Sequence, residues 1–226
     1  MRTVALVPAR AGSQRIPRKN LAMLGGVTLV RRALECALDS GAFDCVALSS
    51  DDAEILAEAG GLDVRPVLRP AELATPASPT YDAVVHALGE LDGAGFDAVA
   101  VIQCTSPLTA PEDLAGAMQL LDRSGAESVV TVARVVGAEH PSKLKRLVGD
   151  RLLPYLEDDR LQPSQELPEV WARNGSLYAS RSDVIRGGRL LGDDIRGYEM
   201  PPERSVDIDT PLDLAFAEFL LARGLE

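Results

Sequence analysis

Short apolar runs alternate with segments of helical period along most of the chain, and this alternation restricts the possible folds more than any other feature. Strand-like runs lie at 3–9, 45–50, 62–68, 97–103 and 127–135, and helix-like segments lie at 28–41, 52–61, 78–93 and 111–125. Runs such as "AVAVI" are apolar throughout, which is typical of parallel strands buried on both faces. The pattern therefore predicts an α/β fold with a mostly parallel sheet between helices.

Local signals mark where several of these helices should begin and end. Gly41 is placed to end the first helix, and Pro111 is placed to open a later one. Near the end of the chain, Thr210 has the character of an N-cap, Pro211 suits the first helical position, and Asp213 suits the third. These signals predict a closing helix within residues 209–225.

The alternation stops between residues 137 and 172. This segment holds four prolines and mixed charges, and most of it has neither a helical nor a strand period. After it, residues 173–181 predict a strand that returns to the sheet. We therefore interpret 137–172 as an arm inserted into a single domain that spans residues 1–226.

The first predicted strand runs directly into a basic loop. Within "VALVPARAGSQRIPRKN", four cations follow the strand: Arg10, Arg15, Arg18 and Lys19. The whole chain has a formal net charge of −11, so this cluster is local. Parallel sheets bind ligands at the C-terminal ends of their strands, which is where the loop lies. The loop is either a phosphate-binding site or a solvated basic surface loop.

The loop differs from the common phosphate-binding motifs. It contains neither GxxxxGK[ST] nor GxGxxG, so a P-loop and a dinucleotide fingerprint are both excluded. Gly12 permits backbone bends, Ser13 supplies a hydroxyl donor, and Arg10 and Lys19 bring charge from opposite sides of the loop. The residues themselves favour a phosphate-binding loop of a different kind.

A pair of aspartates forms the second candidate site, in "RSVDIDTPLD". In an extended segment, Asp207 and Asp209 would share one face, while Val206 and Ile208 would point into the core. Paired carboxylates suit Mg²⁺, which commonly binds one or two carboxylates together with substrate phosphates. The alternative is a helix-entry turn, which accounts well for Asp213 and less well for Asp207, because an acid between apolar residues needs a partner.

Composition excludes several classes of protein. A sequence pI near 4.7 argues against binding to nucleic acid or to anionic membranes, which requires a basic face. The chain has neither the apolar stretch of a membrane span nor the pattern of a signal peptide, so we expect a cytoplasmic protein. Cys36, Cys45 and Cys104 lack the spacing of a zinc site or a disulfide framework.

Seven motifs together carry a resemblance to a known family. They are "PARAGSQRIPRKN", "SSDDAEI", "LRPAELAT", "QCTSPLT", "HPSK", "RNGSLY" and "ERSVDIDTPLD". In order and approximate spacing they are similar to the acylneuraminate cytidylyltransferases. The resemblance implies a Rossmann-like nucleotidyltransferase domain with an inserted dimerisation arm that is exchanged in a homodimer. It also implies transfer of CMP from CTP to an acidic 2-keto sugar, such as a sialic-acid-like nonulosonate, with release of pyrophosphate.

The resemblance assigns roles to individual residues. It places the catalytic residues Arg10 and Lys19 on the phosphates of CTP, with Ser13 and Asn20 completing the loop. Nucleotide-binding positions are matched by Arg69, Thr80 and Gln103, and acceptor-binding positions by Gln103 and Lys143. Asp207 and Asp209 match the carboxylates that hold Mg²⁺.

The chain also departs from the family pattern. Gln14, Thr109 and Ser164 stand where many members have a cation, and Pro76 stands where an acid is common. These changes leave other acceptors open, namely 3-deoxy-octulosonic acid or a carboxylated phosphonate. A non-catalytic nucleotide-binding module is a further alternative, although such a module would be expected to have lost Lys19 or the aspartate pair.

Overall fold

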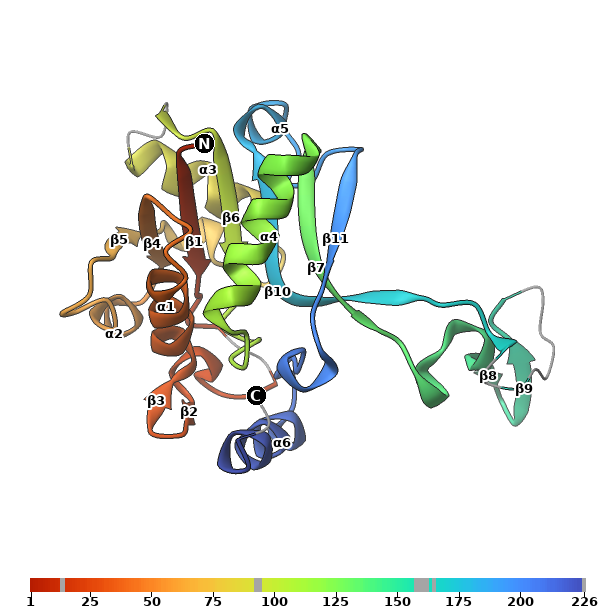
Figure 1. Cartoon of the computed structure of the whole chain (residues 1–226). Coiled ribbons are helices and arrows are strands. Elements are labelled where there is room, and N and C mark those ends of the chain that lie inside the picture. The colour runs from red at the N-terminus through yellow and green to blue at the C-terminus, as the bar shows by residue number, and fades with distance from the viewer. Residues whose placement is uncertain (13–14, 92–94, 157–162, 164–165, 225–226) are drawn as a thin grey trace.

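A seven-stranded sheet forms the centre of the protein (Figure 1). The computed structural model describes residues 1–12, 15–91, 95–156, 163 and 166–224. Across the sheet the strand order is β11-β7-β10-β6-β1-β4-β5. The strands are β1 (Thr3–Pro8), β4 (Cys45–Ser50), β5 (Arg65–Leu68), β6 (Ala98–Ile102), β7 (Ser128–Arg134), β10 (Trp171–Arg181) and β11 (Ile195–Glu199).

Most of these strands are parallel, as the alternating pattern predicts. β6, β1, β4 and β5 run parallel to their neighbours, and so do β7 and β11. The returning strand β10 lies antiparallel between β6 and β7. The chain builds outward from β1 first through β4 and β5, then on the other side through β6. The ends of β1 and β6 therefore flank the point where the strand order reverses.

Helices cover both faces of the sheet, so the residues of each central strand alternate between two cores. In β1, Ala5 and Val7 belong to one core, and Val4 and Leu6 belong to the other. The first core is covered by α1 (Leu29–Asp39), α2 (Ala53–Ala57), α4 (Pro111–Ser124) and α6 (Pro211–Ala222). The second core is covered by α3 (Thr80–Glu90) and α5 (Ser182–Arg186). None of the helices in the described part of the chain is long and apolar enough to cross a membrane.

The predicted helix ends are confirmed by their local geometry. Gly41 follows α1 with φ +59°, a left-handed conformation that glycine adopts without strain. Pro111 is the first residue of α4. At α6, the Thr210 side chain accepts from the amide of Asp213, whose Oδ2 accepts from the amide of Thr210 at 2.7 Å. This reciprocal capping box fixes where the last helix begins.

The arm projects away from the sheet, and it contains more regular structure than its sequence indicates (Figure 1). β7 and β10 pair along its base, and β8 (Lys145–Val148) and β9 (Arg151–Pro154) form an antiparallel hairpin further out. The sequence shows no strand period over most of 137–172, yet this hairpin forms within it. Most of its side chains are exposed, so no burial alternation marks the sequence.

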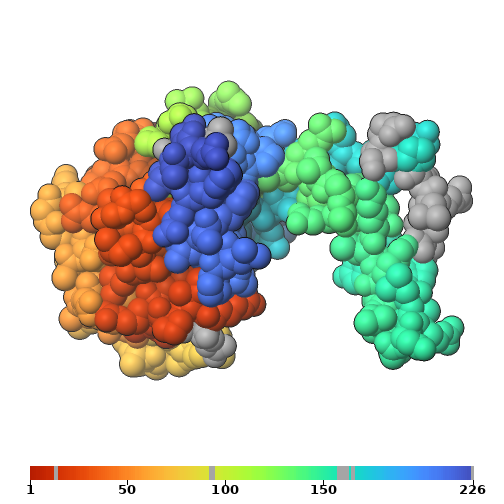
Figure 2. Space-filling view, turned by 90° about the horizontal axis from the view of Figure 1, so that it is seen from below, coloured from red at the N-terminus to blue at the C-terminus, as the bar shows by residue number. Residues whose placement is uncertain are grey.

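Exposed apolar side chains are concentrated on the arm. Leu147, Leu152 and Tyr155 of the hairpin region are each at least 60% exposed. Figure 2 shows the arm standing clear of the rest of the molecule over most of its length. Smaller elements complete the fold: β2 (Met23–Leu24) pairs with β3 (Val27–Thr28), and single 3₁₀ turns lie at Lys19–Leu21, Ala71–Leu73, Gly137–Glu139, Pro141–Lys143 and Pro202–Arg204.

Candidate functional site

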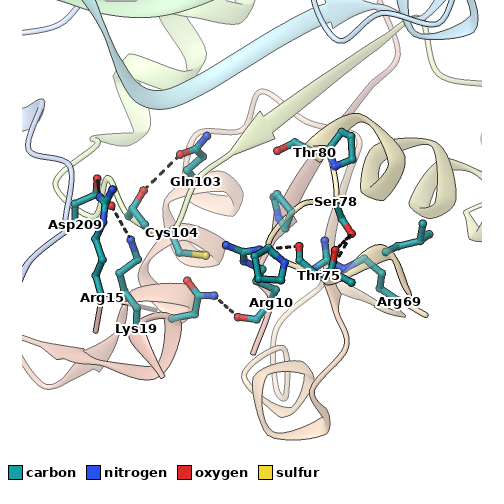
Figure 3. Close-up of a pocket in the computed structure, with 16 residues that line it drawn as sticks. Arg10, Arg15, Lys19, Arg69, Thr75, Ser78, Thr80, Gln103, Cys104 and Asp209 are labelled. Carbon is teal, nitrogen blue, oxygen red and sulfur yellow. Dashed lines mark hydrogen bonds and ion pairs between the residues drawn. The ribbon is translucent and has the colours of Figure 1, made fainter. Parts of the chain in front are cut away.

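A cleft of about 530 Å³ opens at the C-terminal ends of β1 and β6 (Figure 3). This is the position where open α/β sheets bind ligands, because the strand order reverses there. Its charged lining residues are Arg10, Arg15, Lys19, Arg69 and Asp209, and the others are Pro8, Asn20, Leu73, Thr75, Pro76, Ser78, Pro79, Thr80, Gln103, Cys104 and Thr105. The described lining therefore carries an excess of positive charge within an acidic chain.

The loop after β1 is held by its own polar groups and by the opposite wall. Arg10 Nη1 donates to the carbonyl oxygen of Thr75 at 2.7 Å, which bridges the cleft. Asn20 Nδ2 donates to the carbonyl oxygen of Arg10 at 2.9 Å and closes the loop on itself. Arg18 adopts φ +55°, and its guanidinium pairs with Glu54. These contacts of Arg10, Arg18 and Asn20 hold the described part of the loop, while the Arg15 and Arg18 side chains are 66% and 58% exposed.

Lys19 links this loop to the segment that holds the aspartates. Its Nζ donates to the carbonyl oxygen of Ile208 at 2.8 Å and lies 3.2 Å from Oδ1 of Asp209. Arg15 approaches the same carboxylate, with Nη1 2.5 Å from Oδ2. Figure 3 shows these three side chains converging at one end of the cleft. Sequence analysis assigned no role to Arg15 beyond its charge, since nothing in the sequence distinguishes it from Arg18.

Arg69 occupies the opposite end of the cleft and is buried. Only 6% of the residue is exposed, and its Nε and Nη2 have no hydrogen-bond partner within the described part of the chain. Burial lowers the pKa of Arg69 and the nearby Arg10 acts in the same direction, whereas Asp51, whose Oδ1 lies 4.0 Å from Nη2, opposes both. Buried donors of this kind are normally satisfied by an acceptor, so Arg69 is a candidate to bind a ligand in the cleft.

The two aspartates differ in their surroundings. Asp209 lines the cleft, whereas Asp207 is not among the lining residues. Desolvation raises the pKa of Asp207, and the charge of Asp209 adds to this, while a hydrogen bond from Thr105 and the charge of Lys19 oppose it. The carboxylates are thus close enough to interact. Within the described residues, no group of three or more His, Cys, Asp or Glu side chains forms a metal cage.

Thr80 and Gln103 line the cleft from its two walls. Thr80 is the first residue of α3, and Gln103 follows β6 and accepts from Thr105 Oγ1 at 3.5 Å. Gly175, with φ +82°, lies behind Gln103. A Cβ at this glycine would meet Ser106 Oγ at 3.1 Å and Gln103 Oε1 at 3.6 Å. The backbone conformation and the close approach both account for glycine in "RNGSLY".

The other predicted site residues lie elsewhere. Lys143 contributes to a smaller cavity in the arm, with His140 and Glu169, and not to the main cleft of the same chain. Ser13 lies outside the described residues, as do Gln14 and Ser164. Cleft residues that sequence analysis did not assign include Arg15, Thr75, Ser78 and Thr105.

Two of the departures from the family pattern lie near the cleft. Pro76 is a lining residue. Thr109 is buried, and its Oγ1 donates to the carbonyl oxygen of Ser106 at 2.8 Å. Its side chain therefore serves the loop after β6 and does not face the cleft.

The fold and the cleft define an α/β protein with a cationic site at the ends of its parallel strands. A family model described as cytidylyltransferase matches residues 4–169. The chain belongs to the cytidylyltransferase family, and the resemblance found in the sequence motifs is confirmed. The family model ends within the arm, so the aspartate segment lies beyond it.

Curated relatives agree with this assignment. The chain is 34% identical over 222 residues to N-acylneuraminate cytidylyltransferase A of Danio rerio, which covers 95% of this chain and 49% of that protein. It is 32% identical to CMP-N,N'-diacetyllegionaminic acid synthase of Legionella pneumophila, with 100% of this chain and 99% of that protein covered. The chain thus spans about half the length of the first relative and nearly all of the second.

Solved structures show the same fold. A CMP:2-keto-3-deoxy-manno-octonic acid synthetase complexed with CTP superposes with a TM-score of 0.74 at 21% identity, covering 99% of this chain and 100% of that one. A 4-diphosphocytidyl-2C-methyl-D-erythritol synthase from Anaerococcus prevotii superposes with a TM-score of 0.67 at 14% identity, covering 98% and 99%. The predicted α/β nucleotidyltransferase fold is confirmed.

Proposed function

We propose that this protein transfers CMP from CTP to a sugar acid and releases pyrophosphate. The hydroxyl on the anomeric carbon of the acceptor attacks the α-phosphorus of CTP. The bond from this phosphorus to the bridging oxygen breaks, pyrophosphate leaves in line, and the hydroxyl proton is lost. Such a reaction needs its reactants held in line and its developing charge neutralised, which are tasks for a cationic cleft.

The observation that carries this proposal is the buried guanidinium of Arg69. Its Nε and Nη2 are without hydrogen-bond partners in the described structure, and Arg10 is a second cation near enough to disfavour its charge. An anionic or carbonyl-bearing ligand in the cleft would accept hydrogen bonds from these donors and would reduce the repulsion between the Arg69 and Arg10 guanidinium groups. In this proposal Arg69, Thr80 and Gln103 bind the nucleoside, and Arg10 and Lys19 bind the phosphates.

The loop after β1 is suited to bind phosphates because its cations are already positioned. Lys19 is only 14% exposed and is fixed by Ile208 and Asp209, so it loses little conformational freedom when a phosphate binds. Arg10 and Asn20 are joined through the Arg10 carbonyl. Ser13 belongs to the same loop and completes the proposed set of phosphate ligands.

Mg²⁺ is the cofactor we propose, with Asp207 and Asp209 as its protein ligands. Two interacting carboxylates beside a phosphate site fit this ion, which takes few protein ligands and completes its shell with substrate oxygens and water. When bound, the ion would neutralise charge on the triphosphate. To bind the ion, the Asp209 carboxylate would have to give up part of its ion pairing with Arg15 and Lys19. The aspartate pair is also our candidate for accepting the acceptor's proton.

The acceptor is proposed as a nonulosonate resembling sialic acid, because relatives named for N-acylneuraminic and legionaminic acids match over nearly all of this chain. Thr109 is buried and Gln103 lines the cleft, so acceptor recognition falls to Gln103 and to Lys143. 3-Deoxy-octulosonic acid and a carboxylated phosphonate are the alternative acceptors.

A homodimer is the assembly we propose. The arm exposes large apolar side chains, including Leu147 and Leu152 on the hairpin and Trp171 at the start of β10, and among the described residues the main contacts of each hairpin strand are with the other. A second copy of the chain would bury this surface. Lys143 lies in the arm and outside its own chain's cleft, so in such a dimer it would serve the partner subunit's site.

The test is pyrophosphate release from CTP and Mg²⁺ with a panel of acids. The panel contains N-acetylneuraminic, legionaminic, pseudaminic and 3-deoxy-octulosonic acids and a carboxylated phosphonate. We expect release only when the acceptor is a nonulosonate, with a matching CMP-sugar product. Binding of CTP without release from any member would favour the non-catalytic nucleotide-binding module instead.

A further inference from the structure

The residues that carry the aspartates, 205–209, have no regular secondary structure and form what we call the aspartate strap. No strand ladder fixes this segment, so side-chain and isolated backbone contacts must hold it. Its C-terminal end is fixed by the capping box of α6, because the Asp209 amide donates to Asp213 Oδ2 at 3.0 Å. Its N-terminal end depends on a different pair of residues.

Arg204, directly before the strap, forms a two-pronged ion pair with Asp113. Its Nε lies 2.8 Å from Oδ2 and its Nη2 lies 2.8 Å from Oδ1. Asp113 is 1% exposed and the Arg204 side chain is 23% exposed, so the carboxylate of the pair is buried and the guanidinium is only partly so. Two parallel hydrogen bonds between planar groups set an orientation as well as a distance. The hydrogen bond to Asp113 also raises the pKa of Arg204.

Asp113 lies in the first turn of α4, directly after the loop that follows β6. It is the third residue of α4, and its Oδ2 also accepts from the amide of Ala110 at 3.0 Å. The loop ahead of it carries Gln103 and Thr105, both of which line the cleft. A second contact joins the strap to this loop, since the Ile208 amide donates to the carbonyl oxygen of Thr105 at 2.7 Å.

Asp207 lies between these two points of attachment. On one side Arg204 is fixed to Asp113, and on the other Ile208 is fixed to Thr105 and has a fully buried side chain. Asn174 adds a third contact through Nδ2 to Ser205 Oγ at 2.9 Å. The contacts of Arg204 and Ile208 therefore attach the strap, on both sides of Asp207, to the loop after β6 and to the first turn of α4, and the same loop carries Gln103.

We infer that Arg204 and Asp113 are positioning residues that hold the aspartate strap in register with the loop after β6. This role deepens the proposed function, and the effect on turnover rests on that function. Neither Arg204 nor Asp113 is among the residues that line the cleft. The pair acts through Asp207 and Asp209, which it keeps at a fixed place against the cleft.

The experiment compares two double variants of the full chain. Asp113→Asn/Arg204→Gln removes the two-pronged pair without leaving a buried charge unpaired, which keeps the protein folded. The matched control is Arg31→Gln/Glu35→Gln, which removes a part-buried pair with the same 2.8 Å contact on α1. For both variants we would measure amide hydrogen exchange of residues 201–210, Mn²⁺ affinity in the presence of CTP by electron paramagnetic resonance, and kcat.

We expect faster exchange of the Ile208 amide, weaker Mn²⁺ binding by about 10-fold, and a kcat lower by about 10- to 100-fold, because misplacement by about 1 Å can cost about 100-fold. The control should match the unmodified chain in all three. Unchanged exchange at Ile208 would overturn the inference whatever the activity, and so would faster exchange with unchanged Mn²⁺ affinity and kcat. Absence of turnover in the unmodified chain would instead count against the proposed function. Amide hydrogen exchange at Ile208 would still test the positioning role of the ion pair in that case.

Discussion

Arg15 and Asp209 form an ion pair at the end of the cleft, with Nη1 2.5 Å from Oδ2, although 194 positions separate them in the sequence. The two side chains are 66% and 48% exposed. Exposed ion pairs contribute only about 0–1 kcal/mol, so this contact can be exchanged at little cost. A triphosphate entering the cleft would offer Arg15 a stronger partner and release Asp209.

Substitution of Arg15 should therefore weaken the binding of CTP more than the binding of CMP. Arg15→Gln removes a charge-assisted bond worth about 1.5–3 kcal/mol, which is about a 10- to 150-fold loss of CTP affinity. CMP lacks the β- and γ-phosphates and should bind as before. Arg18→Gln is the matched control, because Arg18 carries the same charge in the same loop but pairs with Glu54. Calorimetric titration of both nucleotides measures the effect, and equal losses for CTP and CMP would contradict it.

The two neighbouring acids, Asp209 and Asp213, should give opposite phenotypes. Asp209→Ala should leave a folded protein without metal-dependent turnover, since no neighbour can replace a Mg²⁺ ligand. Asp213→Ala should lower the free energy of unfolding by about 0.5–2 kcal/mol through loss of the cap. It should keep metal-dependent turnover at a reduced rate, because the Asp209 amide also loses its acceptor. Thermal melts and pyrophosphate release distinguish the two outcomes. An inactive but stable Asp213→Ala protein beside an active Asp209→Ala protein would refute the metal assignment.

The cap at Asp213 also predicts a pH dependence of stability. Desolvation would raise the pKa of Asp213, but hydrogen bonds from Thr210 and from the Asp209 amide outweigh it, and the net pKa is lowered below 3.8. A lowered pKa means that the stabilisation is present above pH 3.8 and is lost as pH falls through the native value. The difference in unfolding free energy between the unmodified chain and Asp213→Asn should therefore become smaller as the pH falls below 3.8. Denaturant unfolding between pH 3 and pH 7 tests this.

The fold was predictable wherever burial leaves a pattern in the sequence. β1 and β6 are apolar because both faces are covered, and the Thr210–Asp213 cap is a local signal that tertiary contacts do not alter. The hairpin β8–β9 was not predictable, since most of its side chains are exposed and no alternation marks its strands. The edge strand β11 was not predicted either, because most of its side chains are also exposed.

The candidate site was predictable in its residue types and less so in its contacts. The cations of the first loop and the aspartates were identified from charge and spacing, but their meeting depends on how 194 positions of chain fold between Arg15 and Asp209. Thr109 stands where many members of the family have a cation, and the structure adds that the threonine side chain is buried against its own loop. Sequence alone cannot tell which direction a side chain takes after a strand ends.

Nucleotide choice should follow from the polar groups at the Arg69 end of the cleft. Cytosine presents an amino donor at the position where uracil presents a carbonyl acceptor, and a mismatched buried polar group costs about 1–3 kcal/mol. UTP should therefore be a poor substrate, with kcat/KM about 5- to 150-fold lower. Steady-state rates with each nucleoside triphosphate measure this. Equal turnover of UTP or a purine triphosphate would be incompatible with the proposed reaction.

Lys143 lines the cavity of the arm and is not among the lining residues of its own chain's cleft, so in the proposed homodimer it would meet the acceptor in the partner subunit's site. Lys143→Met should lower acceptor kcat/KM by about 10- to 150-fold through loss of a charge-assisted bond worth about 1.5–3 kcal/mol. The KM for CTP should barely change. Equal effects on both substrates, or none, would return Lys143 to a structural role in the arm.

Mixing of two defective variants tests whether this role acts between subunits. A Lys143→Met chain has an intact cleft and a defective arm, whereas an Asp209→Ala chain has a defective cleft and an intact arm. If each arm serves the partner's cleft, a mixed dimer contains one site with both parts intact. Co-refolding of the two variants should then restore activity well above their summed rates, up to about a quarter of the unmodified rate when half of the dimers are mixed. If each arm serves its own cleft, no mixed dimer contains a complete site and the rates should only add.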